Sequence, residues 1–179
     1  MEALDNIRTR RSIRRFTDVP VTAQEIAAVI GDARLAPSWK NSQTARYIVI
    51  TDKALKDRIA ASITFSKNRL NIEGAAALVV LCTRDGIAGY DPDGTPTTSK
   101  GSHWQSFDAG IACQTFCLAA WAHGLGTLIM GIFDEAAVRE LAAVPEGLSV
   151  SALLAVGHPA DHPDAPKRLP LEEIMTVRE

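Results

Sequence analysis

The sequence predicts an α/β or α+β fold in which helices cover a mostly buried sheet. Two apolar runs, residues 76–82 and 150–156, have the continuous hydrophobic character of strands that are covered on both faces. Segments with helical periodicity alternate with these runs, which favours layers of helices around the sheet. A chain of 179 residues suits one domain, so we expect a single domain over residues 1–179.

The first half of the chain contains four candidate helices and two candidate strands. Thr22 and Glu25 have the spacing of a capping box, which predicts that a helix begins there. Pro37 predicts that this helix ends near Leu35. The β-branched stretch 46–51 predicts a strand. In chain order, we expect helices at 2–8, 22–35, 53–62 and 65–73 and strands at 46–51 and 76–82.

The second half opens with a long loop and an unusually apolar helix. Residues 86–102 are rich in Gly, Pro, Asp, Ser and Thr, and loops of this length are often lids or binding segments. The helix expected at 106–123 is apolar around its axis, so it needs a cover on every side, and a second subunit is the expected cover. Asp108 is interpreted as a residue at the start of this helix. The remaining elements are strands at 128–130 and 150–156, a helix capped by Asp134, and a Pro-rich tail from Gly157.

Composition excludes several classes of protein. Lys and Arg number 19 against 21 Asp and Glu, a net charge of −2, which argues against a protein devoted to coating nucleic acid. The uncharged stretch 109–133 contains interrupting Gly, Gln, Thr and His, so we expect no membrane span. Three cysteines, no CxxC and no secretory leader predict a reduced, cytoplasmic protein. His158 and His162 are separated by prolines that disfavour a helix, and we predict no metal site.

Arginines are concentrated near the amino terminus. Five of the eight residues 8–15 are arginine, in a chain whose net charge is −2. Guanidinium groups match phosphate oxygens bidentately, and the Ser12 hydroxyl adds a donor. A phosphate ligand, a contact with nucleic acid and a solvated basic surface are all compatible with this run. Lys167 and Arg168 form the one other basic cluster, which weakens the nucleic-acid hypothesis.

The polar turn 36–43 is the second candidate site. Ser38, Asn41 and Gln43 supply donors and acceptors for a planar polar edge, and Trp39 offers a stacking face. An ordinary solvated loop is the alternative interpretation. The chain has neither GxGxxG nor GxxxxGK[ST], so no Rossmann fingerprint or P-loop is predicted.

Taken in order along the chain, these features resemble the nitroreductase family of enzymes that use flavin mononucleotide (FMN). The resemblance extends from Ile7 to Leu169. The matching segments are Arg10-Arg11-Ser12-Ile13-Arg14, Ala36-Pro37-Ser38 with Asn41 and Gln43, Asn68, Asp108-Ala109-Gly110, Leu118-Ala119-Ala120, Gly124-Leu125-Gly126 and Lys167-Arg168-Leu169-Pro170. The sequence departs from the family pattern at Thr44-Ala45, where Pro-Trp is common, and at Trp39, where a small residue is frequent.

The resemblance implies a set of residues that bind FMN. Arg10, Ser12 and Arg168, helped by Lys167, would hold the phosphate, and Arg11 would lie along the cofactor. Arg14 would sit near the N1–O2 edge of the flavin, where a fixed cation stabilises the charge that hydride transfer to N5 creates. The remaining expected contacts are Pro37, Ser38, Asn41 and Gln43 from the other subunit, Asn68 and Asn71 at the polar end of the ring, and the backbone of Ile129, Met130 and Gly131.

The family also implies a fold and an activity. We expect a three-layer α+β sandwich with a central mixed sheet, in an intertwined homodimer with two FMN sites. The expected reaction is ping-pong hydride transfer from NADH or NADPH to a nitroaromatic, quinone or similar acceptor, with no catalytic side chain. The alternatives are a flavin-handling protein without robust turnover, and ene reduction or dehalogenation on the same fold. Tyr90, His103 and Trp104, near the expected lid, are candidates for substrate contact.

Overall fold

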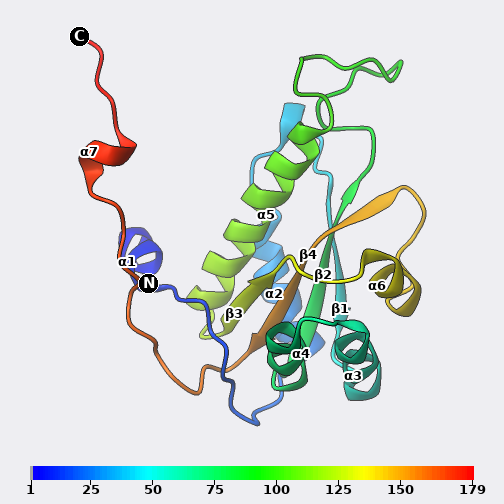
Figure 1. Cartoon of the computed structure of the whole chain (residues 1–179), viewed down its shortest axis with the longest axis vertical. Coiled ribbons are helices and arrows are strands. Elements are labelled where there is room, and N and C mark those ends of the chain that lie inside the picture. The colour runs from blue at the N-terminus through cyan, green and yellow to red at the C-terminus, as the bar shows by residue number, and fades with distance from the viewer. Residues whose placement is uncertain (1) are drawn as a thin grey trace.

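A four-stranded sheet forms the centre of the computed structural model, which describes residues 2–179 (Figure 1). Its strands are β1 (Ala45–Ile50), β2 (Ala77–Arg84), β3 (Gly126–Met130) and β4 (Leu148–Gly157), in the order β1-β2-β4-β3. All three pairings are antiparallel. The four strands therefore form an antiparallel sheet and not the expected mixed sheet. Ser12 forms an isolated parallel bridge with Thr127 of β3.

Helices cover both faces of the sheet, which confirms the three-layer α+β fold. Alternate residues of β2 face opposite sides: Val79 and Leu81 pack beneath α2 (Ala23–Ala33) and α5 (His103–Ala122). Leu78 and Val80 belong to the second core, to which α3 (Lys53–Ser62), α4 (Ser66–Glu73) and α6 (Glu135–Leu141) contribute. A strand covered on both faces must be apolar at every position, which is why β2 and the matching part of β4 read as continuous hydrophobic runs.

Local signals locate several helix starts. Thr22 and Glu25 form the capping box at the start of α2, with the Thr22 Oγ1 accepting from Glu25 N at 3.2 Å. The side chain of Asp134 caps α6 as expected, accepting from Ala137 N at 3.1 Å. Two further helices are short, namely α1 (Ala3–Thr9) and α7 (Leu171–Ile174).

The longest helix differs from its prediction. α5 begins at His103, three residues before the expected start, so residues 103–105 are helical as well. Asp108 therefore lies well inside α5 and not at its start, which corrects its interpretation as a helix-start residue. None of the helices within residues 2–179 combines the length and hydropathy that a membrane span needs.

Residues 15–17 and 158–160, which are far apart in the sequence, lie side by side. Thr17 N donates to His158 O, and Ala160 N donates to Arg15 O, each at 2.9–3.0 Å. Glycine is required at Gly157 in this region, because a Cβ there would lie 2.8 Å from the Phe16 ring. The last residues then run out past the helices and carry the exposed α7 (Figure 1).

Candidate functional site

The arginine segment runs along the beginning of β3. Ile13 is fully buried and its N donates to Thr127 O at 2.9 Å. Gly126 allows this approach, since a Cβ there would lie 2.7 Å from Ile13 Cγ1. With Ile13 held inward, the polar residues on both sides of it remain at the surface or only half-buried.

Four of these five arginines carry uncompensated charge. Arg15 pairs with Asp161 at 2.7 Å, but within residues 2–179 Arg8, Arg10, Arg11 and Arg14 form no ion pair with a carboxylate. Arg11 Nη1 donates to Arg8 O at 2.7 Å and Arg10 O at 2.9 Å, so only backbone carbonyls hold this guanidinium. Clustered guanidinium groups without carboxylates form an anion site, because charge-assisted hydrogen bonds to an external oxyanion remain available.

The far end of β3 exposes an apolar strip beside an amide. Ile129 is 45% exposed although its neighbours Leu128 and Met130 are buried, and Ile132 is 58% exposed. The Asn68 side chain is buried on α4, and its Nδ2 donates to Ile132 O at 3.0 Å. The structure therefore places Asn68 beside the residues that directly follow β3.

Two further predicted residues, Asn71 and Gly131, lie on α4 and directly after β3. Asn71 lies half-buried on α4, and Gly131 is exposed directly after β3. A Cβ on Gly131 would meet nothing within 4 Å. The backbone at Gly131 therefore leaves room for a flat ligand.

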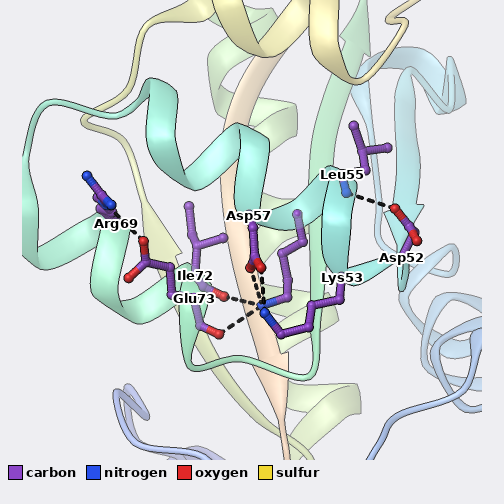
Figure 2. A network of polar contacts seen from close by, with 8 residues as sticks. Asp52, Lys53, Leu55, Asp57, Arg69, Ile72 and Glu73 are labelled. Atoms are coloured by element: carbon purple, nitrogen blue, oxygen red, sulfur yellow. Dashed lines mark hydrogen bonds and ion pairs between the residues drawn. The ribbon is translucent and has the colours of Figure 1, made fainter.

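Lys56 holds the helix that carries Asn68. This lysine is 2% exposed, and its Nζ donates to Ile72 O at 2.8 Å and Glu73 O at 2.9 Å, at the end of α4 (Figure 2). Burial lowers the pKa of Lys56, while the Asp57 carboxylate 3.7 Å away opposes that shift. A cation at a helix C-terminus satisfies the last carbonyls and interacts favourably with the dipole.

Sequence analysis did not identify Lys56. A signal was nevertheless present: Lys56, Ile59 and Ala60 share one face of α3, and a lysine on an apolar face requires buried acceptors. The surrounding ion pairs Lys53–Asp57 and Arg69–Glu73 lie at the surface around this contact (Figure 2).

The second candidate segment is a strained turn fastened to α5. Lys40, Asn41 and Gln43 have φ values of 45°, 55° and 49°, in the left-handed region that costs energy for residues other than glycine. Ser38 Oγ accepts from Gln43 N at 2.8 Å and closes the turn. Strain of this kind persists only where surrounding contacts impose it, and it is concentrated at functional sites.

Asp108 supplies the main contact from α5 to this turn. Its carboxylate is 4% exposed and accepts from Trp39 N at 3.1 Å (Oδ1) and 2.9 Å (Oδ2). Burial raises the pKa of Asp108, and the Trp39 N–H opposes that shift. The Trp39 ring packs on Trp104 with centroids 4.7 Å apart. Trp39, which departs from the family pattern, thus joins the turn to the first residues of α5.

A large hollow separates α5 from the end of β3. It measures about 510 Å³ and is lined by Ile129, by Gly110 and Gln114 of α5, and by the stretch of β4 that extends past β3. Polar groups line its far end: Gln105 Nε2 donates to Thr83 Oγ1 at 3.0 Å. Its volume is typical of sites for cofactors and other small molecules.

The cysteines belong to the two hydrophobic cores. Cys82, Cys113 and Cys117 are buried and form no disulfide. Burial raises the pKa of Cys82 to about 11, which keeps it a neutral thiol near pH 7. Within residues 2–179, no three His, Cys, Asp or Glu side chains gather in a geometry that could hold a metal ion.

Some predicted residues are not brought to the arginine segment within one chain. Lys167 and Arg168 are exposed, and no ion pair joins either to a described residue. The tail beside them is fixed only as far as His162, whose ring lies 5.9 Å from Trp121. The turn that contains Pro37, Ser38, Asn41 and Gln43 is attached to α5, and no hydrogen bond among the described residues links it to residues 10–14.

Together these groups fit a ligand with an anionic end and a flat ring. The uncompensated guanidinium groups and the Ser12 hydroxyl would bind the anion. The exposed Ile129 and the open backbone at Gly131 would lie against the ring, and Asn68 would lie at its polar end. This donor set matches FMN, whose phosphate and isoalloxazine need those two environments.

Comparisons with known proteins agree with this geometry. The sequence model of the nitroreductase family matches residues 7–158. The chain is 30% identical over 175 residues to the NADPH-flavin oxidoreductase of Vibrio harveyi, covering 96% of this chain and 72% of that protein. It is 30% identical over 186 residues to the FMN reductase (NAD(P)H) of Bacillus subtilis, covering 97% and 72%. A nitroreductase family protein from Streptococcus pneumoniae has the same fold, with a TM-score of 0.87 at 23% identity, covering 99% and 100%.

Proposed function

Because the chain belongs to the nitroreductase family, we propose that it is an FMN-dependent oxidoreductase that uses NAD(P)H to reduce a small organic acceptor. The observation that carries this proposal is the arginine segment. Arg10, Arg11 and Arg14 keep uncompensated charge on a strand-like segment beside β3. The other end of β3 exposes Ile129 next to the buried Asn68. An anion site at one end of β3 suits the phosphate of FMN, and an open apolar edge at the other end suits its ring.

Each residue has a physical task in this proposal. Arg10 and Ser12, with Lys167 and Arg168 from the tail, bind the phosphate. Arg168 lies six residues beyond the His162–Trp121 contact, and a stretch of that length spans up to about 20 Å when extended. Arg11 lies along the cofactor.

The remaining contacts surround the ring. Arg14 places a fixed positive charge near the N1–O2 edge, which favours the reduced state. Asn68 and Asn71 bond its polar end. The backbone of Ile129, Met130 and Gly131 lies beside it.

The chemistry that FMN supplies when bound is hydride acceptance at N5 and two-electron delivery to a second substrate. The chain's own residues orient both substrates on one open face of the flavin, and Arg14 supplies the fixed positive charge. Since NAD(P)H and the acceptor need the same face, they bind in turn, in a ping-pong order. In this proposal solvent supplies the proton.

The proposal includes a homodimer in which the turn of one subunit completes the site of the other. Pro37, Ser38, Asn41 and Gln43 would reach the flavin of the partner. Support comes from surfaces that one chain leaves uncovered. Leu4 and Ile7 on α1 are 61% and 59% exposed. The tail also exposes large apolar side chains, namely Leu169, Leu171, Ile174, Met175 and Val177. Exposed apolar side chains of this kind can mark a surface that another protein chain covers.

A visible absorption spectrum of the purified protein tests the proposal, followed by anaerobic titration with NADH and NADPH. We expect bound FMN, bleaching by at least one nicotinamide, and recovery of the colour when a nitroaromatic or quinone is added. A colourless protein that does not bind added FMN would contradict the proposal. A flavin that stays oxidised would instead support a flavin-handling protein without turnover.

A further inference from the structure

A second hollow lies at the beginning of α5, and its lining combines aromatic faces with positive charge. It measures about 410 Å³ and is lined by Lys100, His103, Trp104, Ser106 and Phe107. No acidic side chain contributes to this lining. Its volume lies within the range of sites that enclose small organic ligands.

The aromatic part of the lining is held in place. Trp104 Nε1 donates to Thr98 Oγ1 at 2.8 Å, which fixes the ring against the 86–102 loop. The Trp39 ring lies 4.7 Å from it, and the Phe107 ring meets it edge-on at 5.4 Å. Gly89 packs so closely that a Cβ there would lie 2.9 Å from Trp104 Cδ1. A planar ligand entering this hollow would therefore meet a preformed aromatic surface, which lowers the ordering cost of binding.

The positive charge belongs to Lys100. Its Nζ lies 5.0 Å from the centre of the Trp104 ring, within the range of a cation–π contact. Within residues 2–179 neither Lys100 nor His103 forms an ion pair with a carboxylate. The neighbouring hollow around Tyr90 differs in this respect, because there Lys40 pairs with Asp91 at 3.3 Å. The hollow at Lys100 thus combines an aromatic face with a cation that has no counter-ion among the described residues.

This hollow also adjoins the proposed flavin site. Ser106 lines both it and the larger hollow that contains Ile129. The two spaces therefore meet along one turn of α5. A ligand seated on Trp104 and Phe107 can direct its other end toward the exposed edge of β3.

We propose that this hollow is the acceptor subsite and that it selects aromatic acceptors carrying a carboxylate or a similar anionic group. The inference rests on the proposed function and adds its substrate class. Lys100 binds the anionic group, and Trp104 and Phe107 hold the ring. For a nitro acceptor, one N–O bond breaks and the oxygen leaves as water, giving a nitroso group. Two electrons and one proton come as hydride from NAD(P)H, and the second proton comes from solvent.

The test compares 4-nitrobenzoate with the neutral 4-nitrobenzamide as acceptors for the FMN-loaded protein. We expect a lower KM for the carboxylate in the parent protein. Lys100→Gln should reduce the kcat/KM ratio of carboxylate to amide by about three- to fivefold, as for an exposed ion pair. The effect should shrink at high ionic strength, because salt screens exposed charges. Arg58→Gln on α3 removes the same charge from an exposed position elsewhere and should leave the ratio unchanged.

A binding measurement supplies a second readout that needs no turnover. Benzoate should quench tryptophan fluorescence with a lower Kd than benzamide, and Phe107→Ala should weaken both. An unchanged kcat/KM ratio of carboxylate to amide in Lys100→Gln would overturn the inference. A rise in the KM for NADPH as large as the rise in the KM for 4-nitrobenzoate would also overturn it, because Lys100 would then bind the phosphates of the nicotinamide substrate. These outcomes leave the proposed function intact if FMN is bound and bleached. Failure to bind FMN would instead remove the proposed function itself.

Discussion

The Asp108 carboxylate and the Trp39 backbone N–H form a bifurcated contact between the middle of the chain and the strained turn near its start. The oxygens lie 3.1 and 2.9 Å from Trp39 N, and Asp108 is almost completely buried. A buried carboxylate is costly unless hydrogen bonds satisfy it. The contact thus explains how three residues with positive φ persist in the turn, and why a charged residue occupies an otherwise apolar helix.

We expect Asp108→Asn to loosen this turn without unfolding the protein. The amide offers one acceptor oxygen in place of two, so the variant should lose about 1–2 kcal/mol of unfolding free energy. Hydrogen exchange at the Trp39 amide should become faster than in the parent. The exposed Asp164 in the tail provides a matched control, since Asp164→Asn changes the same charge outside any observed contact. Equal exchange rates at Trp39 in both variants would contradict the assignment.

The stability of the parent relative to Asp108→Asn should change with pH in a defined direction. Burial raises the pKa of Asp108 above its ordinary value of 3.8, so the folded state binds this proton more readily than the unfolded chain. The contribution to stability is then complete below the unfolded pKa and is lost as pH rises through the folded pKa. The stability of the parent relative to Asp108→Asn should therefore decrease across that window. Urea unfolding at several pH values checks this trend.

Lys56→Met is expected to destabilise the protein far more than its surface neighbour Lys53→Met. The first change leaves the Ile72 and Glu73 carbonyls without their buried donor, at a cost of about 2–3 kcal/mol. The second removes only an exposed pair with Asp57. Because α4 carries Asn68, FMN binding should weaken in Lys56→Met as well. Similar denaturation midpoints for the two variants would show that Lys56 does not hold α4.

Arg10→Ala and Arg168→Ala should each lower FMN affinity while leaving a folded protein. Losing one charge-assisted contact to phosphate corresponds to roughly a ten- to hundredfold rise in Kd. Arg15→Ala is the matched control, since Arg15 is paired with Asp161. Flavin content after dialysis measures the loss of FMN. Riboflavin has the ring but no phosphate, so its binding should be unchanged if the lost contact is to the phosphate. Unchanged FMN content in both variants would rule out the phosphate assignment.

Mixing two inactive variants tests whether subunits share a site. A Ser38→Ala/Asn41→Ala protein should bind flavin poorly through one half of the site, and Arg10→Ala/Arg168→Ala through the other half. After subunit exchange, heterodimers contain one intact site, so part of the flavin binding should return. If exchange is verified by mass and binding stays absent, each site is built within one chain.

Much of the fold could be predicted from local patterns. The runs at 76–82 and 150–156 are buried in β2 and β4, since a strand covered on both faces has no polar position. The Thr22–Glu25 box is present because it satisfies helix donors within four residues. In the same way, the arginine segment could be recognised because its residues are adjacent in sequence.

Long-range contacts could not be predicted in this way. Asp108 and Trp39 are 69 residues apart, and Lys56 reaches carbonyls 16 and 17 residues away. Nothing in the spacing of Asp108 distinguishes a helix-start residue from one that holds a distant turn. Only the packing of α5 against that turn decides its role.

The sequence by itself determined the layered fold, the main helix caps and the segment that carries the clustered arginine charge, because each depends on periodicity or on neighbours within a few residues. Tertiary structure decided which strand end lies beside Asn68, which carboxylate holds the strained turn, and which lysine remains without a counter-ion at the head of α5. Those outcomes depend on burial and on partners from distant segments, which exist only once the sheet and its two helical layers have packed together.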